Sequence, residues 1–343
     1  MSKIRIGITC PSEIANRRFL PAVTGMEDIE YVGVGVNTAE ERYGDDLPSE
    51  ETVKAMLERG MQKAESMKSS FGGRIFPSYE SIVTSPEIDA IYIPLPPALH
   101  YRWAKMALEH GKHVLVEKPA TISLEDTDDL IKTAEKKGLA LHENYMFIYH
   151  KQLEAINDLV RSGEIGDVRL YRISFGFPMR AANDFRYSRA MGGGALLDAG
   201  GYTIRYASHL LGETAEVRCA VLNGIDTFEV DMYGSGALIN SDGACAQIAF
   251  GMDNEYKCEL EIWGSKGTFV TGRVLTAPAG FTPTGKLIKG GKETTVTLPE
   301  DDAFRNSIGR FCECITSDDK RRENYRTIEH QAELVRSFMQ MAN

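Results

Sequence analysis

The sequence predicts an α/β protein with two domains. The first is built on a doubly wound parallel sheet, and the second is an α+β domain with a large, mostly antiparallel open sheet. The chain has 343 residues, which is long for one average domain and sufficient for two buried cores. Strand-like apolar runs alternate with helical patterns over residues 3–147, whereas strand follows strand over residues 168–272. We therefore place the two domains at residues 1–143 and 144–343.

Five apolar runs in the N-terminal half indicate strands, and the longer stretches between them have the periodicity of helices. The predicted strands cover residues 3–9, 31–37, 90–96, 113–118 and 139–147, and the predicted helices cover residues 17–25, 49–72, 100–111 and 124–138. Strands that alternate with helices form βαβ units, which make neighbouring strands parallel and place helices on both faces of the sheet. The first domain is therefore predicted to be of the Rossmann type.

The second half begins with a helical pattern over residues 153–161 and continues with runs in which apolar positions alternate. Gly, Asn or Asp marks the breaks between these runs, which indicates antiparallel strands. The predicted strands cover residues 168–177, 216–224, 230–241, 245–252, 256–265 and 267–272. Two closing segments, residues 303–316 and 328–341, carry apolar residues at helical spacing and are expected to cover the sheet or the domain junction.

The composition favours a small-molecule partner. The formal charge is −10 and the pI is near 5.3, with acidic and basic residues intermixed, which argues against a nucleic-acid footprint or a membrane surface. The six cysteines have no zinc-site spacing, so we expect reduced thiols and no metal. The N-terminal segment enters a strand without the pattern of a secretion signal, so a cytoplasmic protein is expected.

A dinucleotide is expected at the turn after the first strand, because its pyrophosphate binds where a helix begins at the carboxyl edge of such a sheet. That segment is GITCPSEIA, with Gly7, Ser12, Glu13 and Ile14 as candidate contacts. Only Gly7 of a glycine-rich fingerprint is present, so an ordinary strand-to-helix turn is an equally good interpretation.

The end of the second strand does not decide between NAD and NADP. Asn37 can hydrogen-bond a ribose hydroxyl, and Arg42 can reach a 2′-phosphate only from farther along the turn. The alternative for Asn37 is a loop residue that holds its own backbone.

Four further segments carry a resemblance to a known family. They are IYIPLPPALH, HVLVEKP, ENYMF and RYSRAMGGGALLDAGGY, between residues 91 and 202. With these motifs the chain resembles the glucose-fructose oxidoreductase, inositol dehydrogenase and rhizopine catabolism (Gfo/Idh/MocA) family. The residues of these motifs are most similar to those of sugar 3-ketoreductases that act on nucleotide-linked deoxysugars. They are more loosely similar to those of glycoside 3-dehydrogenases and of dihydrodiol or xylose dehydrogenases. The resemblance implies NAD or NADP as cofactor.

The resemblance also implies roles for individual residues. Lys118 and Tyr202 would act at the site of hydride transfer, and Asp198 would contact a substrate hydroxyl. Glu117 would lie near the nicotinamide ribose. The other cofactor positions implied are Leu95, Pro96 and His100, in the turn along the cofactor, and Asn144, beneath the nicotinamide. Tyr145, Arg186, Tyr187 and Arg273 are predicted to line the substrate pocket, with surface positions as the alternative.

Lys118 and Tyr202 suit the chemistry of a ketoreductase. Hydride transfer to a ketone develops negative charge on oxygen, which requires a proton donor and a positive group close to that oxygen. A lysine cation near a tyrosine favours the phenolate, so the two residues can share one proton. The alternative is a surface lysine and a packing tyrosine.

The leading interpretation is an NAD(P)-dependent oxidoreductase that acts on a sugar ring carbon, C3 of a nucleotide-linked keto-sugar or of a glycoside. A second is a dehydrogenase of inositols, free aldoses or trans-dihydrodiols, and a third is a nonreactive dinucleotide-binding sensor. The broad antiparallel sheet also predicts a homodimer or a larger assembly of dimers, because helices cannot cover all of it.

Overall fold

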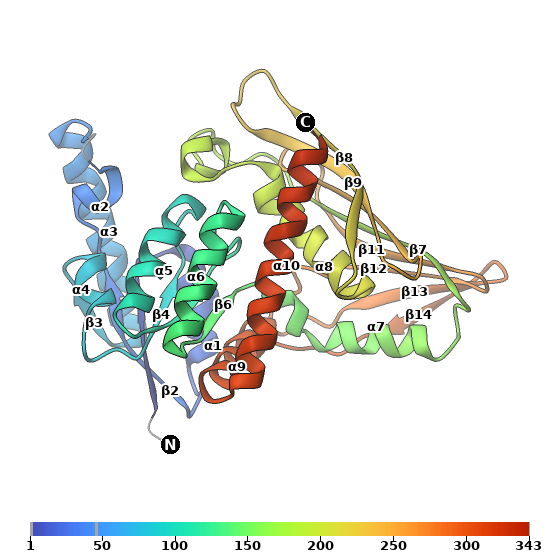
Figure 1. The fold of residues 1–343 in the computed structure, drawn as a ribbon, viewed down its shortest axis with the longest axis horizontal. Helices are drawn as coiled ribbons and strands as arrows, with labels where there is room; N and C mark the ends of the chain where they lie inside the picture. Colours follow the sequence, from blue (N-terminus) through green and yellow to red (C-terminus); the bar gives the residue numbers. More distant parts are fainter. Residues whose placement is uncertain (1–2, 45–46, 343) are drawn as a thin grey trace. The chain divides into compact units, whose positions relative to one another are not determined.

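The computed structural model describes residues 3–44 and 47–342, which form two compact units (Figure 1). Unit 1 comprises Met1–Thr121, Glu125–Asn144 and Ile308–Arg326, and unit 2 comprises Ile122–Leu124, Tyr145–Ser307 and Thr327–Asn343. Within the described residues, no helix combines the length and apolar character needed to cross a bilayer.

Unit 1 contains the predicted doubly wound parallel sheet. Its six strands are β1 (Ile4–Ile8), β2 (Ile29–Gly35), β3 (Arg74–Phe76), β4 (Ala90–Ile93), β5 (His113–Val116) and β6 (Leu141–Glu143). They lie in the order β3-β2-β1-β4-β5-β6, and every described pair is parallel. The order reverses at β1, so the carboxyl ends of β1 and β4 flank the switch point where such sheets bind ligands.

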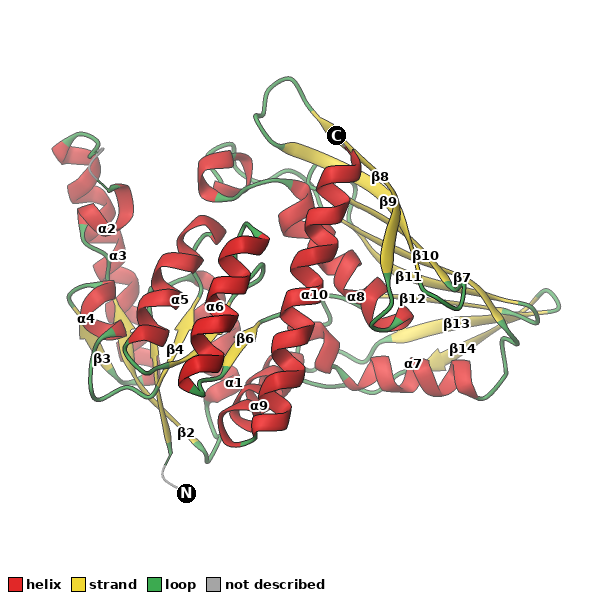
Figure 2. Ribbon diagram, in the orientation of Figure 1, coloured by secondary structure: helices red, strands yellow, loops and turns green. Residues whose placement is uncertain are grey.

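Helices flank this sheet, as the alternating pattern predicts (Figure 2). They are η1 (Ala15–Phe19), α1 (Leu20–Val23), α2 (Ala39–Tyr43), α3 (Glu50–Phe71), α4 (Tyr79–Val83), η2 (Pro97–Leu99), α5 (His100–Glu109) and α6 (Leu124–Lys137). The predicted strand over residues 139–147 ends at Glu143 and continues into the 3₁₀-helix η3 (Met146–Tyr149). Tyr145, Met146 and Phe147 are all buried, which the strict alternation of a half-exposed strand does not produce.

Unit 2 contains the large open sheet. Its eight strands are β7 (Val168–Gly176), β8 (Glu216–Gly224), β9 (Asp231–Ile239), β10 (Cys245–Gly251), β11 (Lys257–Gly264), β12 (Thr268–Gly272), β13 (Thr284–Lys289) and β14 (Lys292–Thr297). They lie in the order β14-β13-β12-β11-β7-β10-β9-β8. The described pairs are antiparallel except β7 with β10, which is parallel, so the prediction of a mostly antiparallel sheet is confirmed.

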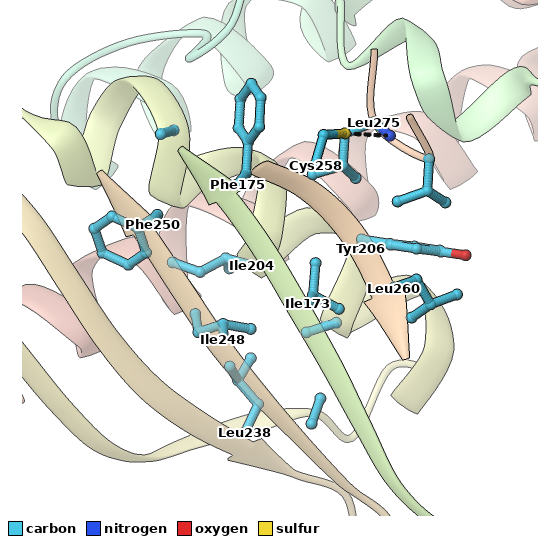
Figure 3. Close-up of a cluster of buried hydrophobic side chains, with 14 of the residues drawn as sticks. Ile173, Phe175, Ile204, Tyr206, Leu238, Ile248, Phe250, Cys258, Leu260 and Leu275 are labelled. Atoms are coloured by element: carbon cyan, nitrogen blue, oxygen red, sulfur yellow. Dashed lines mark hydrogen bonds between the residues drawn. The ribbon is translucent and has the colours of Figure 1, made fainter. Parts of the chain in front are cut away.

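Helices pack on one face of this sheet. In unit 2 they include α7 (Lys151–Arg161), η4 (Phe185–Tyr187), η5 (Arg189–Met191), η6 (Leu196–Gly200), α8 (Gly201–Leu211) and the part of α10 (Asp318–Ala342) that follows Arg326. Most of α9 (Ala303–Thr316) and the start of α10 belong to unit 1. Side chains of α8 interleave with those of the strands in a continuous apolar core (Figure 3): Ile173, Phe175, Ile204, Tyr206, Leu238, Ile248, Phe250 and Leu260. Each such side chain contributes about 1.5–3 kcal/mol when fully buried, so this core fixes α8 against the sheet.

Candidate active site

The turn after β1 is held by hydrogen bonds of two side chains. The Cys10 thiol donates to Pro94 O at 3.4 Å, and burial raises the pKa of this thiol to about 12. Ser12 Oγ accepts from Ala15 N at 3.1 Å and so starts the helix, while Glu13 and Ile14 are exposed. Gly7 serves packing, because a Cβ there would lie 2.7 Å from the Ile88 side chain.

The end of β2 is held by a carboxylate that the sequence analysis missed. Glu41 accepts hydrogen bonds from the backbone of Thr38 at 2.9 Å, Tyr79 at 3.0 Å and Glu80 at 2.9 Å. The Asn37 amide donates to Thr38 O at 3.0 Å and accepts from the Tyr79 hydroxyl at 3.4 Å. Thr-x-x-Glu is a capping-box pattern, so the bond of Glu41 to Thr38 was predictable from the sequence, whereas its bonds to Tyr79 and Glu80 were not.

His100 connects the turn after β4 to the turn after β5. Its ring nitrogens lie 2.7 Å from Leu95 O and 2.8 Å from Pro119 O, and the side chain is fully buried. Burial lowers the pKa of His100 to about 4, although the two carbonyl oxygens favour the protonated ring. His100 therefore fixes the backbone directly before Pro96 and directly after Lys118.

Glu117 and Asn144 are in direct contact. Glu117 Oε1 accepts from the Asn144 amide at 2.7 Å and from the Tyr92 hydroxyl at 2.6 Å, and burial raises the pKa of this carboxyl. Tyr92 was not among the predicted residues; it lies on β4 and is separated from Glu117 by 25 positions. The carboxyl is thus aimed by donors from β4 and from the residue after β6.

In unit 2, the segment GGGALLDAGGY forms the π-helix η6 and the start of α8. Asp231 on β9 anchors its beginning, because Asp231 Oδ2 accepts from Leu196 N at 2.6 Å. Gly194 has a φ of 120°, and a Cβ there would lie 2.5 Å from Asp231 Oδ1. A glycine is therefore required where the segment approaches Asp231.

Arg186 holds Asp198. Its Nε lies 2.6 Å from Asp198 Oδ2, and its Nη1 lies 3.1 Å from Asp184 Oδ1. All three side chains are mostly shielded from solvent. Arg186 thus orients Asp198, whose carboxyl group is suited to accept a hydrogen bond from a hydroxyl group.

Tyr202 is surrounded by aromatic rings, at centroid distances of 5.4 Å from Tyr145, 5.6 Å from Phe147 and 5.2 Å from Phe175. Tyr187 and Arg273, which were also predicted to line the pocket, have different partners. The Tyr187 hydroxyl accepts from Arg180 N at 2.7 Å, and the exposed Arg273 lies 4.7 Å above the Tyr256 ring.

Both halves of the chain match known sequence models. That of the oxidoreductase family with an NAD-binding Rossmann fold matches residues 29–145, and that of the Gfo/Idh/MocA C-terminal domain matches residues 153–270. The chain belongs to the Gfo/Idh/MocA oxidoreductase family. The resemblance drawn from the motifs is thereby confirmed. The comparisons also favour the interpretation as an NAD(P)-dependent enzyme over that as a nonreactive sensor.

Members of the Gfo/Idh/MocA family are similar to this chain over nearly its whole length. A dTDP-3,4-didehydro-2,6-dideoxy-α-D-glucose 3-reductase from Streptomyces violaceoruber is 36% identical over 99% of this chain and 96% of its own. The same activity in Saccharopolyspora spinosa is carried by a protein 34% identical over 90% of this chain and 86% of its own. A 3-ketoreductase from Actinomadura kijaniata, solved with NADP and TDP-benzene, has a TM-score of 0.88 at 33% identity and covers 99% of this chain and 98% of its own.

The residues of unit 1 fit the nicotinamide dinucleotide that this family binds, NAD or NADP. Glu117, held by Tyr92, Asn144 and the backbone of Lys118, supplies a carboxylate suited to accept a hydrogen bond from a ribose hydroxyl. The helix that begins after Ser12 starts at the carboxyl edge of β1, and Ile14 at its first turn is 36% exposed, which suits contact with a ligand.

Proposed function

We propose that this chain is a sugar 3-ketoreductase that reduces a nucleotide-linked keto-sugar with NADPH or NADH as the hydride donor. The observation that carries the proposal is the similarity to four reductases of dTDP-linked didehydro-dideoxyglucose, at 32–36% identity over 90–99% of this chain. Sugars linked to a nucleoside diphosphate are therefore the proposed substrate class.

Lys118 and Tyr202 are the proposed catalytic residues. Variants of the Actinomadura enzyme have been solved in which one lysine or one tyrosine is replaced. In that enzyme the two residues are separated by the same number of positions as Lys118 and Tyr202 here. This equal spacing supports the assignment of both residues.

The mechanism follows from the needs of the reacting oxygen. When bound, the reduced nicotinamide supplies a hydride to the carbonyl carbon. Tyr202 donates its hydroxyl proton to the oxygen, which leaves a secondary alcohol and a phenolate. The cation of Lys118 stabilises that phenolate and the charge developing on the oxygen. Asp198, held by Arg186, accepts a hydrogen bond from a sugar hydroxyl and so orients the ring.

The test compares wild type with Tyr202→Phe on a dTDP-linked 3-keto-sugar, followed by the absorbance of the reduced coenzyme. General acid catalysis contributes about 10²- to 10⁴-fold, so kcat should fall by that factor. Tyr206→Phe is the matched control, because Tyr206 also lies on α8 and its buried hydroxyl has no hydrogen-bond partner among the described residues. A kcat for Tyr202→Phe within about three-fold of wild type, far below the usual acid contribution, would assign Tyr202 to packing.

A substrate panel tests the choice of sugar. Relatives include a D-xylose 1-dehydrogenase from Haloferax volcanii, 30% identical over 78% of this chain, and a trans-1,2-dihydrobenzene-1,2-diol dehydrogenase from Xenopus tropicalis, 26% identical. Free aldoses, inositols and trans-dihydrodiols therefore belong in the panel beside the nucleotide-linked sugar. Faster oxidation of any of these than reduction of the dTDP-linked ketone would replace the proposed substrate class.

The remaining proposals concern the units and their assembly. Residues 1–143 are proposed to bind the dinucleotide, and residues 144–343 to bind substrate and form the oligomer. Val221, Tyr233 and Trp263 are 52%, 44% and 50% exposed on strands of the large sheet, which supports a homodimer through that sheet. All six cysteines are free thiols, which supports a cytoplasmic location.

A further inference from the structure

Gly201, the residue before Tyr202, is held from three sides. Its N–H donates to Leu196 O and closes the π-turn of η6. Its carbonyl oxygen accepts from Gln331 Nε2 at 3.0 Å. Its Cα faces the Tyr145 hydroxyl so closely that a Cβ would lie 2.2 Å from that oxygen. The backbone directly before Tyr202 is therefore fixed by the contacts of Gly201.

Gln331 is the polar side chain that joins these contacts. It comes from α10, and besides its bond to Gly201 its Nε2 donates to the Tyr145 hydroxyl at 3.4 Å. Gln331 and Tyr145 are each only 2% exposed, and Gln331 Oε1 has no hydrogen-bond partner within residues 3–44 and 47–342. A buried amide with an unsatisfied oxygen costs stability, so an apolar side chain would serve packing better at this position.

The hydrogen bonds of Gln331 converge on the surroundings of Tyr202. One reaches the preceding residue of the chain, and the other reaches Tyr145, whose ring meets the Tyr202 ring edge-on at 5.4 Å. Short π-helical segments such as η6 often occur at functional sites, where they shift a side chain relative to a regular helix. Such a shift requires support, and Gln331 and Tyr145 supply it from outside the helix.

We propose that Gln331 is a positioning residue for Tyr202, acting through the Gly201 carbonyl and the Tyr145 hydroxyl. The inference rests on the proposed function, in which Tyr202 transfers the proton. When the side-chain amide is lost, the Gly201 carbonyl loses its hydrogen bond from outside the helix, and a small shift of this backbone moves the Tyr202 ring with it. A displacement of about 1 Å at a reacting group can lower the rate by about 100-fold, so a small rotation suffices.

The test is Gln331→Met, which keeps the length of the side chain and removes both hydrogen bonds. The kcat for the dTDP-linked ketone should fall about 10- to 100-fold, while KM for ketone and coenzyme stays within about two-fold. The solvent deuterium isotope effect on kcat should rise, because a misplaced acid slows proton transfer. In a Tyr202→Phe background the same substitution should cause almost no further loss, since both act on one step.

His330→Leu is the matched control. His330 is the next residue on α10, and its ring bonds Ala215 O at 3.1 Å and Ser208 Oγ at 3.3 Å, so it also joins α10 to the region of α8. It should lower Tm without changing kcat or the isotope effect. Equal losses of kcat in His330→Leu and Gln331→Met would overturn the positioning role and indicate general helix packing.

Tyr145→Phe provides a milder variant should Gln331→Met fail to fold. It deletes only the hydroxyl that accepts from Gln331 and lies against Gly201, and it should lower kcat with unchanged KM. Suppose that Tyr202→Phe is impaired but that Tyr145→Phe or Gln331→Met has wild-type kinetics. This result would overturn the positioning role alone and leave the proposed function intact. A fully active Tyr202→Phe enzyme would instead overturn the proposed function, and the positioning role with it.

Discussion

Asp231→Ala should destabilise the enzyme by about 2 kcal/mol, because Asp231 caps the segment that carries Asp198 and Tyr202. Its carboxylate accepts from Leu196 N at 2.6 Å and also bonds Ala195 N. Loss of an N-cap costs about 0.5–2 kcal/mol, and an unsatisfied buried donor costs about 1–3 kcal/mol. Relief of the burial that raises the pKa of this carboxyl offsets part of the sum.

Urea unfolding followed by circular dichroism measures this effect. With a slope of about 2–3 kcal/mol per molar urea, the midpoint should fall by somewhat under about 1 M. Asp242→Ala removes the same charge from an exposed turn between β9 and β10 and should leave the midpoint unchanged. A difference between the two variants below about 0.5 kcal/mol, the lower limit for a cap, would refute the capping argument.

Three further predictions can be checked on the same preparation. Lys118→Ala should nearly abolish turnover while the dinucleotide Kd, from quenching of protein fluorescence, stays within a few-fold. His113 Nδ1 accepts from Ala140 N, and burial lowers the pKa of His113 from 6.5 to about 4. The unfolded chain therefore takes up this proton first, and stability present above about pH 6.5 is lost as pH falls toward 4; His113→Gln should show a shallower loss in urea titrations. Light scattering at micromolar concentration should give at least a dimer, and a strict monomer would contradict assembly through the large sheet.

Elements long enough to show a period were predictable from the sequence, and short or polar ones were not. Five of the six strands of unit 1 were predicted, but β3 has only three residues and lies at the sheet edge. The hairpin of β13 and β14 was missed because β14, KETTVT, has almost no apolar residues. Its turn, Gly290 and Gly291, was nevertheless a readable hairpin signal.

The candidate site was predictable where the chemistry lies in one continuous motif. Glu117 and Asn144 were predicted separately from their motifs, and the structure brings them into contact at 2.7 Å. Their common partner Tyr92 was missed, as was Asp231, the anchor of the glycine-rich segment. These supporting residues come from other strands, and a strand tyrosine or aspartate has no local pattern that reveals its partner.

Motif residues and the residues that support them respond differently to substitution. Asp198 and Tyr202 are half-buried, and in the proposed function both face a ligand, so the reaction would dictate their identity. Gln331 is fully buried, and it acts only by fixing backbone geometry. A substitution in a motif residue therefore removes a chemical step, whereas a substitution in a supporting residue alters its rate and leaves the reaction type unchanged. Rate and reaction type can then vary independently, because different elements of unit 2 hold the two kinds of residue.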